Sequence, residues 1–218
     1  MTLSTIGAKI GPVSTKVPGF ETVISATTLV THTPKTAPPL NLLIVPGGLG
    51  NTLLGNDTWI EDFVASRFAS TDIVASVCTG ASSLVKSGVL KRKNATTNKA
   101  AWSSVTGLPG AEKVNWQPNA RWTHDGKIWT SSGVAAGMDM TYALLRWMYG
   151  DQAVNDTMNS VGKSPRCKGA SLKSFQKRMN FCIFFILSIK QADFILIEYA
   201  PHVHQSWDPF AVVHKVSG

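Results

Sequence analysis

The chain has 218 residues, of which 44% are hydrophobic and 16% are charged. This composition excludes an intrinsically disordered chain, and the length suits one domain with a sizeable core. The formal net charge of +8 would normally favour a nucleic-acid partner. However, residues 162–191 carry seven basic side chains and no acidic ones. The positive balance therefore belongs to this segment, and we predict no nucleic-acid partner.

Short apolar runs alternate with segments of helical periodicity along the chain. The runs predict buried strands, and the alternation favours a parallel sheet covered by helices in a single α/β domain over residues 1–218. Residues 100–121 are rich in Gly and Pro and predict a loop region. The predicted strands are Val23–Leu29, Leu42–Val45, Ile73–Val77 and Lys127–Ser131, and the predicted helices are Trp59–Phe68, Thr79–Ser87 and Ala136–Tyr149.

Cys78 lies where a predicted strand passes into a predicted helix. Ser76 and Gly80, two residues to either side, are small, as a sharp turn that exposes a nucleophile requires. Unpaired amides and the dipole at the start of a helix favour the thiolate form of a cysteine. The pattern therefore predicts a nucleophilic cysteine, although cysteine is also a common buried apolar residue.

A second strand ends in Pro46-Gly47-Gly48 and is followed by a polar loop. In an open parallel sheet, ligands bind beyond the carboxyl ends of the strands. Both Gly48 and Cys78 occupy such ends. The amides of Gly48 and Thr79 are therefore predicted to bind a developing negative charge.

Together, three motifs resemble the ThiJ/PfpI family of the class I glutamine amidotransferase-like superfamily. They are Val45–Gly48, Cys78–Ala81 and Trp129–Asp139. The resemblance runs from about Leu3 to Val161 and resumes from about Ala192 to Phe210. It is greatest to the fungal isocyanide hydratase-like members. It implies a flavodoxin-like three-layer sandwich with a mainly parallel sheet.

The resemblance also implies a reaction, the hydration of an isocyanide to an N-formamide without a cofactor. Cys78 would attack the isocyanide carbon, and Thr79 would position the substrate or water. The amides of Gly48 and Thr79 would stabilise the developing charge. A small-molecule substrate and a homodimer are expected, while Gly133 and Asp139 match family positions with a structural role.

The chain departs from the family pattern at its start. In the family, a strand-helix unit precedes the segment that Leu3–Ser14 resembles, and it supplies a central strand and an acidic residue close to the cysteine. We predict that this first strand-helix unit is missing, which would expose two edges of the sheet. The chain would then be a compromised enzyme or a non-catalytic, truncated remnant.

Histidines are also scarce around the predicted site. None occurs between Cys78 and His124, which argues against glutaminase chemistry, since that reaction needs a histidine base to activate the thiol. His202 and His204 have a spacing that can bind a metal, but no third ligand accompanies them. We therefore predict no metal site.

Residues 162–191 form an anomalous insert within the resemblance. They include two of the three cysteines and the apolar run Phe181–Ile189, which is too short to span a bilayer. We favour a retained intron, because 30 codons preserve the frame and Gly162–Ser164 is compatible with a donor sequence. The alternative is a genuine insertion that docks on an anionic membrane surface or on a partner.

A redox role remains open beside the hydratase hypothesis. An exposed cysteine that favours the thiolate is oxidised stepwise to sulfenic and sulfinic acids, as in a stress-responsive protein. Met1–Ile10 lacks the charged start and apolar core of a secretory signal. With three cysteines and no paired framework, the chain is predicted to be cytoplasmic, without a membrane partner.

Overall fold

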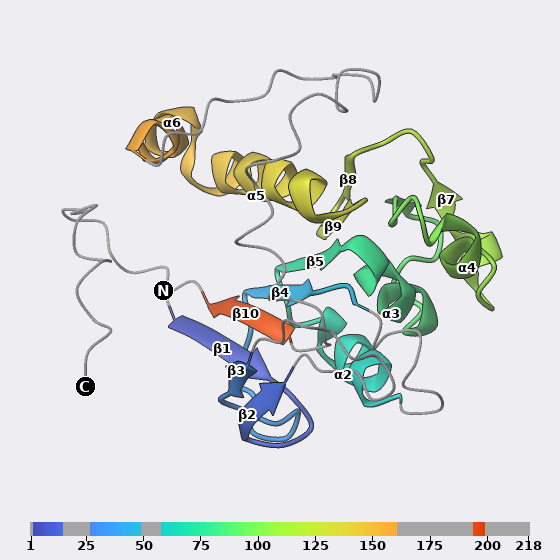
Figure 1. The fold of residues 1–218 in the computed structure, drawn as a ribbon, viewed down its shortest axis with the longest axis horizontal. Coiled ribbons are helices and arrows are strands. Elements are labelled where there is room, and N and C mark those ends of the chain that lie inside the picture. The colour runs from blue at the N-terminus through green and yellow to red at the C-terminus, as the bar shows by residue number, and fades with distance from the viewer. Residues whose placement is uncertain (1, 15–26, 49–57, 161–193, 199–218) are drawn as a thin grey trace.

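A computed structural model describes residues 2–14, 27–48, 58–160 and 194–198. Within these residues, the centre is a six-stranded sheet in the order β1-β10-β4-β5-β9-β8 (Figure 1). The strands β4, β5 and β9 run parallel to one another. Their neighbours run antiparallel: β10 to both β1 and β4, and β8 to β9. The bounds are β1 Thr2–Ile6, β4 Leu42–Val45, β5 Ile73–Val77, β8 Trp122–Asp125, β9 Ile128–Ser131 and β10 Phe194–Glu198.

Helices cover both faces of this sheet and make three layers (Figure 1). On one face, α2 (Trp59–Phe68) and α3 (Ala81–Lys86) pack against Val74 and its neighbours in one apolar cluster. On the other, α5 (Val134–Tyr149) packs against Ala75 and Trp129 in a second cluster. Successive residues of β5 therefore point into different layers, as the pleat of a strand requires. A strand buried on both faces reads as a continuous apolar run.

The shorter elements lie at the margins of the sheet. Two small strand pairs join β2 to β3 and β6 to β7, and α6 follows α5 directly. Among the described helices, none is long and apolar enough to cross a membrane. The bounds are β2 Gly11–Ser14, β3 Thr27–Val30, β6 Asn94–Ala95, α4 Trp102–Thr106, β7 Asn115–Trp116 and α6 Asp151–Ser160.

The flavodoxin-like α/β class predicted from sequence is confirmed, but the sheet is mixed. Two strands make it so: β10 lies antiparallel between β1 and β4 and pairs with both, and β8 is antiparallel to β9. The two open edges expected from a missing central strand are therefore joined by β10. Of the predicted strand Val23–Leu29, only residues 27–29 are described, and they begin β3.

Two further predictions of secondary structure differ from what the structure shows. The predicted loop over residues 100–121 contains α4, the short 3₁₀ turn Ala111–Lys113 and β7. The predicted helix from Thr79 instead starts as a 3₁₀ turn, η1 (Cys78–Gly80), before α3. The insert 162–191, Cys167, Cys182, His202 and His204 lie outside the described residues.

Candidate functional site

Cys78 stands at the sharp turn between β5 and η1 (Cys78–Gly80). Its φ is +60°, one of two positive φ values among the described non-glycine residues. A non-glycine residue in this left-handed region costs about 1–3 kcal/mol and persists only where its surroundings hold it. The cysteine is free and partly exposed, so the turn presents a thiol at the carboxyl end of a central strand.

Two glycines allow the backbone after β4 to pack against this turn. A Cβ placed on Gly47 would lie 2.7 Å from the Cβ of Cys78, the amide of Thr79 and the carbonyl of Val77. A Cβ on Gly80 would lie 2.3 Å from the carbonyl oxygen of Val45. Neither position has room for a larger residue. The sequence singled out Gly48, and the structure adds Gly47, which packs directly against Cys78.

Thr79 and Gly48 are joined directly. The Gly48 amide donates to Thr79 Oγ1 at 2.8 Å, and the Thr79 hydroxyl donates in turn to the Gly48 carbonyl oxygen at 3.1 Å. The structure thus brings all three site residues predicted from the sequence, Cys78, Thr79 and Gly48, to one place. It also shows the Gly48 amide engaged by a side chain, so binding a substrate there requires an exchange of partners.

Thr97 is a residue that the sequence analysis did not single out. Its side chain is fully buried, and its hydroxyl donates to the Cys78 carbonyl oxygen at 3.1 Å. In the sequence, Thr97 is marked only by its place in the polar stretch that follows Leu90, which does not predict a contact with Cys78. The contact joins residues 19 positions apart, and it depends on how β6 and the following loop approach the turn.

Acidic and histidine side chains lie elsewhere in the described part of the chain. There, no hydrogen bond or ion pair links an Asp, Glu or His side chain to Cys78, and no group of three or more potential metal ligands converges. His124 stacks on Trp129 with ring centroids 4.0 Å apart. Asp139 accepts from Arg121 Nε at 3.1 Å and Nη2 at 2.5 Å, which gives it a structural contact.

One cation lies on the segment that follows Thr97. Burial lowers the pKa of Lys99 below its usual value. Its ammonium group donates to Thr96 Oγ1 at 2.8 Å and lies 4.6 Å from the centre of the Trp102 ring. These contacts hold the polar stretch against the fold through Thr96 and Trp102.

The fold and the turn together define an α/β protein with a cysteine presented between a strand and a helix. The chain belongs to the DJ-1/PfpI family, whose model matches residues 3–146.

A relative of known name is consistent with membership of this family. The chain is 36% identical over 122 residues to an isonitrile hydratase of Pseudomonas putida, covering 55% of this chain and 50% of that protein. It thus spans about half the length of that relative.

Two solved structures show the same fold. A ThiJ/PfpI family protein from Pseudomonas syringae has a TM-score of 0.58 at 22% identity, covering 75% of this chain and 64% of that one. Drosophila melanogaster DJ-1beta has a TM-score of 0.54 at 17% identity, covering 64% of this chain and 74% of that one.

Proposed function

We propose that this protein hydrates an isocyanide to an N-formamide, with Cys78 as the nucleophile. The observation that carries the proposal is the partly exposed Cys78 thiol, held in a left-handed turn at the end of β5. The 36% identity to an isonitrile hydratase supports the choice of reaction. The shared region covers half of that relative, so the substrate has to be established by direct assay.

The reaction balances without a cofactor. The Cys78 thiolate forms a bond to the terminal isocyanide carbon, and a proton adds to the same carbon to give a thioimidate. Water then adds to this carbon, while a second proton reaches the nitrogen. Breaking the carbon–sulfur bond returns the thiolate and releases the N-formamide, while the hydroxyl proton goes to solvent and replaces the proton taken up at carbon. The net change is the addition of one water molecule to the isocyanide.

Thr79 and Gly48 would act on the charged stages of this sequence. The Gly48 amide would leave the Thr79 hydroxyl and donate to the substrate, while the Thr79 amide supplies a second donor. The released Thr79 hydroxyl would orient the attacking water. Protons would come from water, because no described Asp, Glu or His side chain contacts Cys78. We therefore expect slow turnover.

A substrate comparison tests the reaction. The protein is incubated separately with an aryl isocyanide, an alkyl isocyanide and glutamine. Formamide is measured by chromatography with mass detection, and ammonia by a coupled assay. We expect formamide above the buffer rate and no ammonia. Ammonia from glutamine would overturn the assignment. So would the absence of formamide together with rapid oxidation of Cys78 by peroxide, which favours a redox role.

We further propose a homodimer in the cytoplasm, where a free thiol persists. Three exposed apolar side chains support the dimer, and they lie in the part of the chain that contains β1, β2 and β3. Leu3 is 58% exposed, and Ile10 and Leu29 are each 63% exposed. Packing these side chains against a second copy of the chain would remove their apolar surface from water. Light scattering should give twice the chain mass for the wild type and the chain mass for Leu29→Asp. A wild-type monomer would contradict the proposal.

A further inference from the structure

The segment Asn94–Thr97 leads from the margin of the sheet to the cysteine turn. We call it the strut. It starts with β6, which pairs with β7, and its last residue contacts the Cys78 carbonyl.

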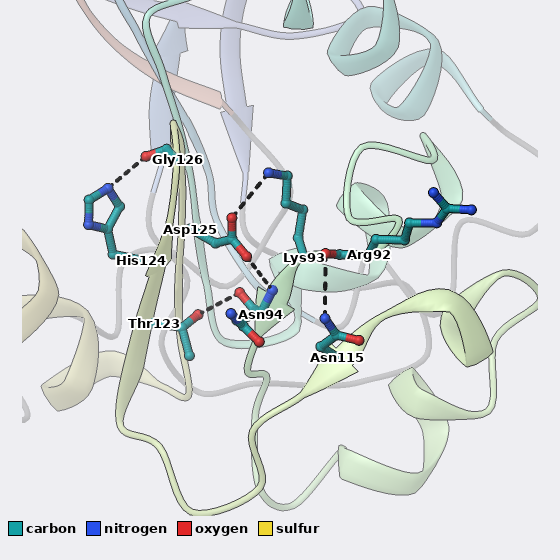
Figure 2. A network of polar contacts seen from close by, with 8 residues as sticks. All are labelled: Arg92, Lys93, Asn94, Asn115, Thr123, His124, Asp125 and Gly126. Carbon is teal, nitrogen blue, oxygen red and sulfur yellow. Dashed lines mark hydrogen bonds and ion pairs between the residues drawn. The ribbon is translucent and has the colours of Figure 1, made fainter.

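Asp125 fixes the outer end of the strut (Figure 2). Its carboxylate accepts from the Asn94 amide at 2.9 Å and from Lys93 Nζ at 3.1 Å. Thr123, two residues earlier on β8, donates to the Asn94 carbonyl at 3.2 Å. Both backbone groups of Asn94 are therefore tied to the sheet at its β8 edge.

Buried hydroxyls fix the middle of the strut. The Thr96 amide donates to Thr130 Oγ1 at 2.7 Å, and Thr130 and Thr123 share a hydrogen bond at 2.7 Å. Thr96 and Thr130 are both fully buried. A buried polar network whose members are paired holds one geometry. The strut is thus a fixed part of the fold between β9 and the turn.

We propose that Thr97 is a positioning residue for Cys78. The strut presents the Thr97 hydroxyl to the Cys78 carbonyl, and this bond helps to hold the left-handed backbone that exposes the thiol. Without it, the Cys78 carbonyl loses the Thr97 donor, and the turn relaxes toward ordinary φ values that draw the sulfur inward. The proposal rests on Cys78 being the reactive group of the proposed function.

The test is the alkylation rate of Cys78 in the full-length chain. Iodoacetamide is used from pH 5 to pH 10, and the modified peptide is quantified by mass spectrometry. Thr97→Val keeps the shape and removes the donor. We expect it to lower the Cys78 rate about fivefold, the factor that corresponds to one ordinary hydrogen bond. Thr97→Ser should restore the rate to within about twofold, because it restores the donor.

Two further variants sharpen the test. Thr106→Val removes a similar hydroxyl–carbonyl bond, to Trp102 at 3.0 Å, and it should leave the Cys78 rate unchanged. Asp125→Asn weakens the contacts at the outer end of the strut. Because Asp125 is partly exposed, this variant is expected to fold even if Thr97→Val does not. It should lower the rate by about twofold. A purely structural Thr97 would lower the melting temperature of Thr97→Val without changing the Cys78 rate or its pH profile.

The outcomes separate this proposal from the proposed reaction. Wild-type alkylation rates in both Thr97→Val and Asp125→Asn would overturn the positioning role, even if the wild type hydrates isocyanides. A reduced rate that Thr97→Ser restores would support it, even if no isocyanide is turned over. In that case the reaction assignment fails and the role of Thr97 stands.

Discussion

Ser76 is a buried hydroxyl in the strand that leads to the cysteine. It is fully buried, and its Oγ has no hydrogen-bond partner among the described residues. A buried polar atom without a partner costs about 1–3 kcal/mol. The position requires a small side chain, and the structure gives no reason why that side chain should be polar.

The first prediction is that Ser76→Ala stabilises the protein. The change removes the unpaired hydroxyl and leaves a cavity smaller than a methyl group, so the free energy of unfolding should rise by about 1 kcal/mol. Urea denaturation of the variant and the wild type measures it. Ser82→Ala is the matched control and should be destabilising, because Ser82 Oγ donates to the Thr79 carbonyl at 2.8 Å. A loss of stability in Ser76→Ala would show that its hydroxyl has a partner.

Asp125 gives a pH-dependent prediction. The Asn94 amide and then the Lys93 side chain hold its pKa below the usual value. A carboxyl with a depressed pKa contributes stability above its unfolded pKa, and the contribution is lost as pH falls through the folded pKa. Asp125→Asn should therefore cost about 1 kcal/mol at pH 7, since the group is partly exposed. Denaturation midpoints should begin to converge as pH falls below about 4, the ordinary aspartate pKa, and should meet below the lowered pKa of the folded state. A difference that does not change with pH would contradict this origin.

At the scale of elements, Lys127 ties the start of β9 to the end of α2. Its ammonium group donates to the carbonyls of Phe68, Ala69 and Thr71 and lies 4.3 Å from the centre of the Phe68 ring. Carbonyls at the end of a helix lack partners within the helix, and lysine is a favourable cap there. One side chain therefore holds α2 against the central strands.

We expect Lys127→Met to lower the free energy of unfolding by about 1–2 kcal/mol, because three carbonyls lose a charged donor. Thermal denaturation measures the change. Lys91→Met is the control, since Lys91 is an exposed lysine and its replacement should have little effect. Equal melting temperatures for the two variants would mean that water satisfies the carbonyls as well as Lys127 does.

The sequence predicted the central elements because their patterns are local. The apolar runs of β4 and β5 and the helical spacing of α2 match the structure at both ends. The cysteine turn was predictable because Ser76 and Gly80 mark it from either side. The strut was missed because β6 has two residues, and no periodicity can show in so short a strand.

The partners within the site were also beyond local patterns. Gly47, after β4, packs against the turn that follows β5, and Gly80, in that turn, packs against the end of β4. The bond of Thr79 to Gly48 joins positions 31 residues apart. A glycine that ends a strand predicts a turn in the sequence. Only the arrangement of β4 beside β5 shows that Gly47 fits against Cys78.

At the scale of the whole molecule, β10 closes the sheet between β1 and β4. The resemblance predicted a missing first strand-helix unit, and the described sheet runs from β1 to β8 with β10 between β1 and β4. The sequence of β10 shows an apolar run, but nothing in that run indicates which strands it pairs with or in which direction. The mixed sheet was therefore not predictable from the alternation of strands and helices.

The basic insert 162–191 has an electrostatic consequence that can be tested. It carries seven basic and no acidic residues within a chain of net charge +8. We predict that its deletion removes any weak binding to anionic lipid vesicles or nucleic acid, and that any such binding by the full chain fades with salt. Co-sedimentation at several salt concentrations measures it. Undiminished binding after the deletion would locate the basic surface elsewhere in the molecule.

The central claim is that the thiol of Cys78 performs isocyanide hydration. Its most direct test is the rate of formamide formation by the wild type, Cys78→Ala and the control Cys167→Ala, with the melting temperature of each measured alongside. The account predicts turnover by the wild type and the control. It predicts the buffer rate for Cys78→Ala, with a melting temperature no lower than that of the wild type. Formamide produced by Cys78→Ala at the wild-type rate would contradict it.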